Sequence, residues 1–237
     1  MKKLTVLLFI ALFTVIGITT TSGKGIQLTS KKYSVKSFSA IEANTVADIV
    51  YTQSDITSVR VNCIGEMMNH ITIKVHDGVL FIENSIALDN KSNTPIVVFV
   101  TSPQLDSIKH SGVGNWCLKG SVKSDELHIV SNGIGSIHAL ELKSEKIVVN
   151  YDAIGNLKLA GNTKVVEIKS TGVGTIDCKN LLAETALVKS SKSGNVNCFA
   201  SKNIGLYNEG IGKITYYGNP SFKSLNNGGL GKIIADK

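Results

Sequence analysis

Short glycine-rich segments recur in the second half of the chain, and each could at first sight bind a phosphate. STGVGTIDC at 170–178 and SNGIGSIHA at 131–139 are two examples. A dinucleotide fingerprint needs G-x-G-x-x-G at the start of a helix, and a P-loop needs Lys and Ser or Thr after its last glycine. Neither pattern occurs, and GGLGKI at 228–233 has Ile233 where a calcium-binding nonapeptide carries its Asp ligand. We therefore expect no nucleotide cofactor and no metal site at these segments.

Other residues of catalytic type are few and widely spaced. Cys117, His138 and Asp177 are of the types found in nucleophilic and metal sites. Carbohydrate-active enzymes of β-helix architecture need clustered carboxylates, calcium, or a basic residue over a cleft, and here the candidates are Asp152, Glu209 and Arg60. The chain has no C-x-x-C pair, which argues against a zinc ribbon or a thioredoxin-like site. We expect no catalytic residues.

The glycines keep a regular spacing. One glycine of each segment, which we call the ruler glycine, stands at Gly114, Gly135, Gly155, Gly174, Gly194, Gly212 and Gly231, at intervals of 18 to 21 residues. Such a period, continued over half the chain, predicts a solenoid.

Apolar residues hold fixed positions relative to the ruler glycines. Two and four residues after the glycine lie, for example, Ile137 and Ala139, and six and eight residues before it lie Ile129 and Leu127. This alternation predicts one strand before each glycine and one after it, each with a buried face. The position directly before the glycine is also apolar in all repeats but one, and we count it among the buried columns; it holds Val113, Ile134, Ile154, Val173, Ser193, Ile211 and Leu230.

Each repeat is too short to hold a crossover helix, so its strands must stack on the same strands of the next repeat. The fold class predicted is all-β: a parallel β-helix with about 20 residues per coil, in which the glycines turn the corner between two sheets.

The region before the repeats is also rich in strands but less periodic. His76–Val79 has the composition of a tight hairpin turn. We expect this region to form broader first coils and to cap the N-terminal end, and Tyr216, Tyr217 and Phe222 to close the last coil. No linker divides the chain, so residues 24–237 are expected to form a single domain with its core at about 34–233.

The first residues have the features of an export signal. A basic MKK is followed by the apolar run Leu4–Ile18 and by small residues, which predicts a signal peptide over 1–23. The run is short for a membrane anchor, the alternative, since spanning takes about 20 residues. The net charge of +7 comes from Lys, with Arg60 as the only Arg, so we expect no nucleic-acid partner. We expect no transmembrane span in the mature chain.

Stacked coils bring together residues that are distant in the sequence. Cys178 and Cys198 would be neighbours in a buried column, either as small apolar side chains or as a disulfide, for which parallel strands in register give poor geometry. Cys117 and His138 would be neighbours in an outward column that we expect to be ordinary surface.

Short polar residues flank the ruler glycines on both sides and form the candidate binding surface. The candidate residues are Asn115, Asn132, Asp152, Asn156, Thr171 and Asn195. Turns favour such residues for backbone reasons alone, so a structural role is the alternative.

Several segments together resemble a known family. FSAIEANTVADIVYTQSD at 38–55, VHDGVLFIEN at 75–84, PIVVFVTSPQLDSIKHSGVGNW at 95–116 and the repeated G-[VI]-G turns are similar to the head GIN domain family of autotransporter adhesins, which is common in Bacteroidetes. The resemblance covers about residues 34 to 233. It implies a right-handed β-helix, an exported location and an adhesive role.

We therefore expect an exported, non-catalytic, adhesin-like module that binds a glycan or an envelope protein. It would lie in the periplasm, at the outer membrane or outside the cell. The alternatives are a carbohydrate-active β-helix enzyme, a polysaccharide lyase or hydrolase, and a purely structural envelope protein.

Overall fold

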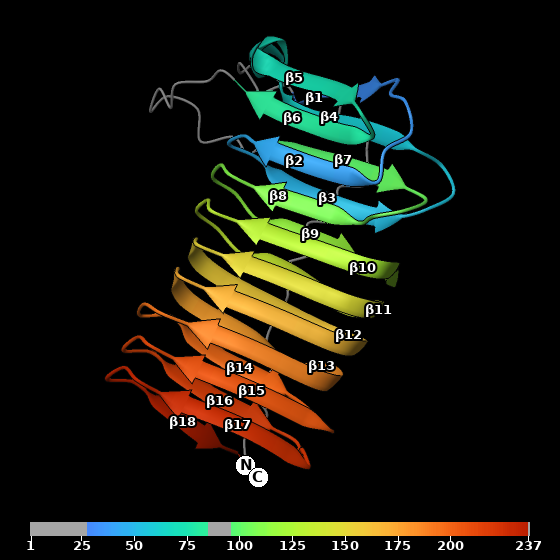
Figure 1. Ribbon diagram of the computed structural model, residues 1–237. Helices are drawn as coiled ribbons and strands as arrows, with labels where there is room; N and C mark the ends of the chain where they lie inside the picture. The colour runs from blue at the N-terminus through green and yellow to red at the C-terminus, as the bar shows by residue number, and fades with distance from the viewer. Residues whose placement is uncertain (1–27, 85–95, 237) are drawn as a thin grey trace, which may run out of the picture.

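The computed structural model describes residues 28–84 and 96–236, and these form a β-solenoid (Figure 1). The expected signal peptide at 1–23 lies outside the described residues. No helix in the described part is long and apolar enough to cross a membrane. The strands are β1 (Leu28–Tyr33), β2 (Ala40–Asn44), β3 (Asp48–Gln53), β4 (Ser58–Ile64), β5 (Ile71–His76), β6 (Val79–Asn84), β7 (Val97–Ser102), β8 (Ser107–His110), β9 (Trp116–Lys119), β10 (Val122–Ser131), β11 (Ile137–Tyr151), β12 (Ile154–Ser170), β13 (Val173–Ser190), β14 (Asn195–Phe199), β15 (Asn203–Asn208), β16 (Lys213–Tyr217), β17 (Phe222–Asn227) and β18 (Lys232–Ala235); a short 3-10 helix, η1, spans Gly65–His70.

Two parallel sheets form the walls of the solenoid, as predicted. One contains β2, β8, β10, β15 and β17 with the second halves of β11, β12 and β13. The other contains β3, β9, β14, β16 and β18 with the first halves of the same three strands. The three long strands differ from the prediction, because their backbone continues as strand around the corner opposite the glycines, where a loop was expected.

The predicted buried columns form the core. Ile129 pairs in register with Ile108 and with Val149, and all three are buried. In the other sheet Ile137 lies between Trp116 and Leu157 in the same way. Burial of stacked aliphatic rows along the whole axis is what stabilises a solenoid, since each coil covers the core face of its neighbours.

The prediction is wrong for the column directly before the ruler glycines. These side chains are exposed, from 39% at Val113 to 88% at Leu230. The physical reason is parity: this position lies three residues before a buried one, so the alternation of a strand directs its side chain outward.

The ruler glycines turn the corner and allow the coils to approach closely. At Gly135 the backbone has a φ of +140°, and a Cβ there would lie 1.9 Å from the carbonyl oxygen of Gly114. At Gly174 a Cβ would lie 1.7 Å from the oxygen of Gly155. A residue with a side chain therefore cannot occupy these two positions without separating the coils. The same close approach occurs at the other ruler glycines except Gly194, where a Cβ would come no closer than 3.2 Å, and it explains the period of the sequence.

The N-terminal end is capped, as predicted, but by antiparallel strands. β4 pairs with β7, β1 pairs with β4, and β5 pairs with β6. The predicted hairpin turn joins β5 and β6, with positive φ at Asp77 (48°) and Gly78 (73°). The coil made of β2 and β3 lies between the β6–β7 coil and the β8–β9 coil, so stacking order does not follow chain order here.

The C-terminal end is not closed as predicted. Tyr216 is buried, but Phe222 is 64% exposed. β17 and β18 each pair on one side only within the described residues. Lys223 stands in the inward column after Ile204, with its Nζ 5.9 Å from the Tyr216 ring centroid. An inward-column lysine on a terminal strand opposes further strand addition, which is a common way to protect a sheet edge.

Candidate functional site

The candidate binding residues lie along the glycine corner of the solenoid, in two columns that we call together the corner stripe. Asn132, Asp152 and Thr171 stand three residues before the ruler glycine, and Asn115, Asn156 and Asn195 stand directly after it. Register places the members of each column on successive or alternate coils. The candidate residues therefore share one edge of the solenoid.

The asparagines after the glycine have a structural role on every second coil. The Oδ1 atoms of Asn115, Asn156 and Asn195 accept hydrogen bonds from the backbone N–H of the equivalent residue in the next coil, at 3.0, 3.1 and 2.9 Å. Each side chain thus satisfies an amide at the corner, where the strand begins. Because Asn156 and Asn195 are exposed, their Nδ2 groups remain accessible to a ligand.

The other column contains Asp152, the one carboxylate among the six candidate residues. Lys192 Nζ lies 3.3 Å from Asp152 Oδ1. A hydrogen bond from Thr171 and then the neighbouring Lys192 lower the pKa of the Asp152 carboxyl. An ionised, paired carboxylate suits hydrogen bonding to a polar ligand, whereas a catalytic general acid needs a raised pKa.

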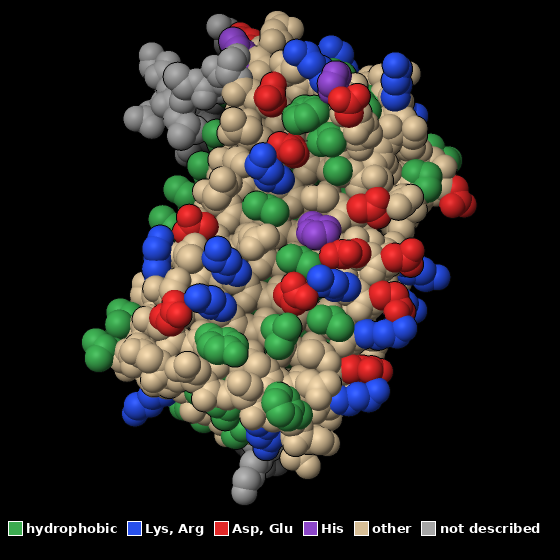
Figure 2. All heavy atoms as spheres, viewed as in Figure 1, with side chains coloured by type: hydrophobic (Ala, Val, Ile, Leu, Met, Phe, Trp, Pro, Cys, Tyr) green, Lys and Arg blue, Asp and Glu red, His purple; other side chains and the backbone are tan. Residues whose placement is uncertain are grey.

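A line of exposed aliphatic side chains runs along the same edge between the two columns, and sequence reasoning misplaced it in the core. We call it the aliphatic ridge: Val113, Ile134, Ile154, Val173, Ile211 and Leu230. Hydrophobic side chains are visible along the left edge of the molecule in Figure 2, which is the edge of the corner loops in Figure 1. The alternation of the strands already contained the signal, because the ridge position is out of phase with the buried columns.

The outward column of Cys117, His138 and Asp177 forms as predicted but shows no site. His138 lies in register with Cys117 on one side and with Lys158 on the other, and Lys158 separates it from Asp177. In the described ranges no group of three or more His, Cys, Asp or Glu side chains could hold a metal ion.

The structure does not bring the candidate enzyme residues together. Asp152 pairs with Lys192, and Glu209 pairs with Lys189 at 3.2 Å, three coils further along the corner. Arg60 lies on the cap strand β4, where its guanidinium covers the Phe99 ring at 4.2 Å from the centroid.

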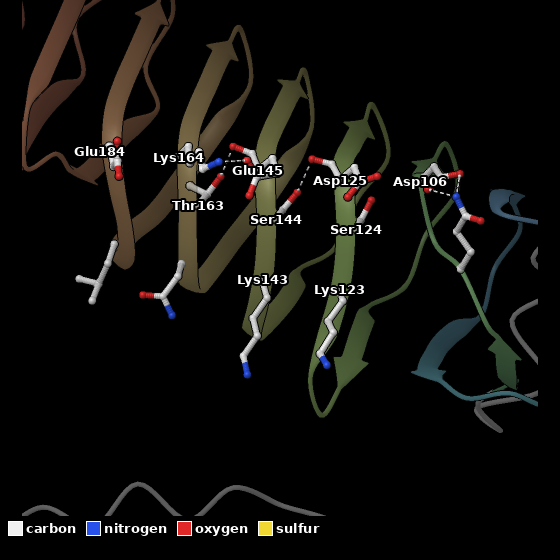
Figure 3. Close-up of a pocket in the computed structure, with 13 residues that line it drawn as sticks. Asp106, Lys123, Ser124, Asp125, Lys143, Ser144, Glu145, Thr163, Lys164 and Glu184 are labelled. Carbon is white, nitrogen blue, oxygen red and sulfur yellow. Dashed lines mark hydrogen bonds and ion pairs between the residues drawn. The ribbon is translucent and has the colours of Figure 1, made fainter.

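A polar groove of about 860 Å³ follows the corner opposite the glycines, and sequence reasoning did not single it out. Figure 3 shows side chains from successive coils along it: Asp106, Asp125, Glu145, Lys164 and Glu184 in one row, with Lys123 and Lys143 nearby. The groove is open and shallow, and it arises because charged residues repeat at one position of the coil.

Two of the four acids that line this groove, Glu145 and Glu184, form ion pairs with neighbouring lysines. Lys164 pairs with Glu145, and Lys202 Nζ lies 2.8 Å from Glu184. The hydrogen bond from Lys202, followed by its charge, lowers the pKa of Glu184. The groove thus contains carboxylates on adjacent coils, but the shift at Glu184 is opposite to the one that glycoside hydrolysis needs in its acid.

The two cysteines predicted to be neighbours are in register and unbonded. Cys178 on β13 pairs with Cys198 on β14, and both are buried free thiols. Burial raises the pKa of Cys198 to about 12 and also raises that of Cys178. They act as small apolar core residues, the first of the two alternatives.

Comparison with solved structures finds the same architecture elsewhere. A putative adhesin from Bacteroides fragilis is 31% identical, with a TM-score of 0.86 over 90% of this chain and 98% of that one. A putative lipid binding protein from Parabacteroides distasonis (19% identity, TM-score 0.67, 89% and 97% covered) and a putative adhesin from Parabacteroides merdae (22%, 0.66, 91% and 98%) share the fold.

The chain was also compared with curated proteins and with family models. No curated protein matches it significantly. Residues 37–220 match the model of the family described as putative auto-transporter adhesin, head GIN domain. With most of its described residues inside that match and a 31% identical structural relative, the chain belongs to the auto-transporter adhesin head GIN domain family.

Proposed function

We propose that this protein is an exported, non-catalytic binding module of the bacterial cell envelope, which recognises a glycan or a protein through the corner stripe. Its family and its 31% identical relative carry adhesin names, which supports a role in attachment. The predicted signal peptide over 1–23 supports export, and residues 24–237 form the mature domain.

One observation supports the corner stripe most strongly. Asn156 and Asn195 present accessible amide groups from alternate coils, and their side-chain oxygens are held in place by the next coil. Coils about 4.8 Å apart give these groups a spacing of about 10 Å along a straight edge. Evenly spaced, immobilised donors suit an extended ligand with a repeating structure, such as a polysaccharide.

The test is a glycan-array screen of residues 24–237, with reducing-end assays on the same polysaccharides. The stripe variant is Asn156→Asp/Asn195→Asp, which keeps the oxygen acceptors of the corner but removes the outward donors. The matched control is Asn162→Asp on the opposite corner. We expect saturable binding that the stripe variant weakens about tenfold and the control leaves unchanged.

Other outcomes would redirect the assignment. New reducing ends would contradict the non-catalytic proposal and favour a carbohydrate-active enzyme. Binding that is equal in the stripe variant and in the control would remove the corner stripe from the site. No glycan binding would leave a protein ligand or a structural role in the envelope.

A further inference from the structure

The side chains of the aliphatic ridge are most exposed at the C-terminal end of the solenoid. Exposure of its side chains lies between 39% and 58% over the first four members, with no trend along the axis, and is 64% at Ile211 and 88% at Leu230. Exposed aliphatic side chains at the tips of corner loops lose apolar hydration when they enter a less polar medium. The last two rungs offer the most surface for this.

Lysines gather at the same end of the ridge. The residues flanking the ridge position are Gly133 and Ser136 at an early corner. At the last three corners one of these two flanking positions holds a lysine: Lys192 beside Ser193, which interrupts the ridge, Lys213 beside Ile211, and Lys232 beside Leu230. We call Ile211, Leu230 and these three lysines the C-terminal tip. It combines the most exposed aliphatic side chains of the ridge with the lysines nearest to it.

Nearby acids reduce this positive charge only in part. Asp152 is paired with Lys192, and Glu209 is paired with Lys189 on the neighbouring sheet face. Asp236 lies near the Tyr217 hydroxyl. Lys213 and Lys232 form no ion pair within residues 28–84 and 96–236, so their charges are available to an anionic partner.

We propose that the C-terminal tip binds the surface of an anionic lipid bilayer, with Ile211 and Leu230 entering the headgroup boundary and Lys192, Lys213 and Lys232 contacting lipid phosphates. Aliphatic side chains flanked by lysines are the combination used by proteins that lie at membrane interfaces. A protein partner would need a matching groove one side chain wide and about 1,000 Å² of buried surface around it. A fluid bilayer adapts to a narrow ridge without such complementarity.

This inference is independent of ligand binding at the corner stripe. It gives the solenoid a preferred attachment point at its C-terminal end, while the earlier coils of the same edge remain free to meet a ligand. The family name, by contrast, says nothing about lipid contact.

The experiment is vesicle co-sedimentation of residues 24–237 with phosphatidylcholine vesicles that contain or lack phosphatidylglycerol. The tip variants are Ile211→Ser/Leu230→Ser and Lys213→Gln/Lys232→Gln. The matched controls are Ile134→Ser/Ile154→Ser in the middle of the ridge and Lys123→Gln/Lys143→Gln in the opposite groove. All substituted side chains are exposed, and circular dichroism checks that each variant is folded.

We expect binding to anionic vesicles that falls with added salt, and little binding to vesicles of phosphatidylcholine alone. Removal of the two lysines should weaken partitioning about thirtyfold at low salt. Removal of the two aliphatic side chains should weaken it at least about tenfold. Both controls should bind like the parent chain.

Two results would overturn the proposal. The first is a folded parent chain that ignores anionic vesicles; if it then self-associates through Ile211 and Leu230 in analytical ultracentrifugation, the tip is a protein contact. The second is equal loss of binding in tip and control variants, which would mean diffuse electrostatic attraction and no site at the tip.

Discussion

Substitution of the corner glycine Gly135 by Ala tests why this fold needs glycine, since this position combines a positive φ with close contact between two coils. The backbone there has a φ of +140°, and the new Cβ would lie 1.9 Å from the Gly114 oxygen. The strained φ costs about 1–3 kcal/mol. Relief of the clash must displace a coil whose corner is held by hydrogen bonds such as Gly135 N to Ile154 O at 2.9 Å, at about 1 kcal/mol each. We expect a loss of about 3–5 kcal/mol in the free energy of unfolding.

Three further glycines supply matched controls. Gly210→Ala has the clash alone, because its Cβ would lie 2.0 Å from the Lys192 oxygen and its φ is not in the left-handed region. Gly120→Ala has the φ alone, at +69° with no atom within 4 Å, and should cost about 1–2 kcal/mol. Gly228→Ala has neither and should change stability by less than about 0.5 kcal/mol.

Urea unfolding followed by circular dichroism measures these differences. Hydrogen exchange at the corner amides adds a local readout, since repeat proteins can unfold in parts. If Gly135→Ala proves no more destabilising than Gly228→Ala, the argument that close coil approach dictates the glycine period is wrong. If Gly120→Ala equals Gly135→Ala, conformation alone explains the glycines.

Three other results are expected. Asn156→Ala removes the acceptor of the Thr175 amide and should cost about 0.5–1.5 kcal/mol by urea unfolding; an unchanged midpoint would mean that water replaces it. Cys178 and Cys198, buried and with raised pKa values, should resist a thiol reagent at pH 8 until the chain unfolds, and rapid native labelling of both would contradict their burial. Burial lowers the pKa of His110, so its neutral form stabilises the fold above about pH 6.5, and that stability is lost as the pH falls toward the lowered pKa. His110→Gln should therefore flatten the pH dependence of the unfolding midpoint in this window. A profile identical to that of the parent chain would refute the role of His110.

Much of the fold could be predicted from the sequence because each coil of a solenoid repeats the same residue pattern at a fixed spacing. The spacing of Gly135 and Gly174 identified the corners, and the columns of Ile129 and Ile137 identified the strands that flank them. Stacked coils put equivalent residues in equivalent environments, so local pattern and tertiary position agree. The hairpin at Asp77 and Gly78 was predictable for a similar local reason, since it needs two consecutive positive φ values.

The candidate site was less predictable because it depends on which side chains meet across coils. The amide of Asn156 could be expected at the corner, but its role as acceptor for Thr175 depends on the register between two strands. Lys164 and Glu145 are 19 residues apart and become partners for the same reason. The charged residues of one coil do not by themselves predict a groove, because the groove is lined by side chains from several stacked coils.

The sequence by itself determined the repeat, the corners and the buried columns, since each is enforced by local sterics and by alternation along a strand. Only the tertiary structure showed the antiparallel cap and the unpaired edge of the last described coil. The cap pairs β1 with β4 and β4 with β7, contacts between segments that share no period. Leu230 is more exposed than the other ridge side chains because it lies beside β18, which pairs on one side only within the described residues, and burial depends on neighbouring coils as well as on the residue.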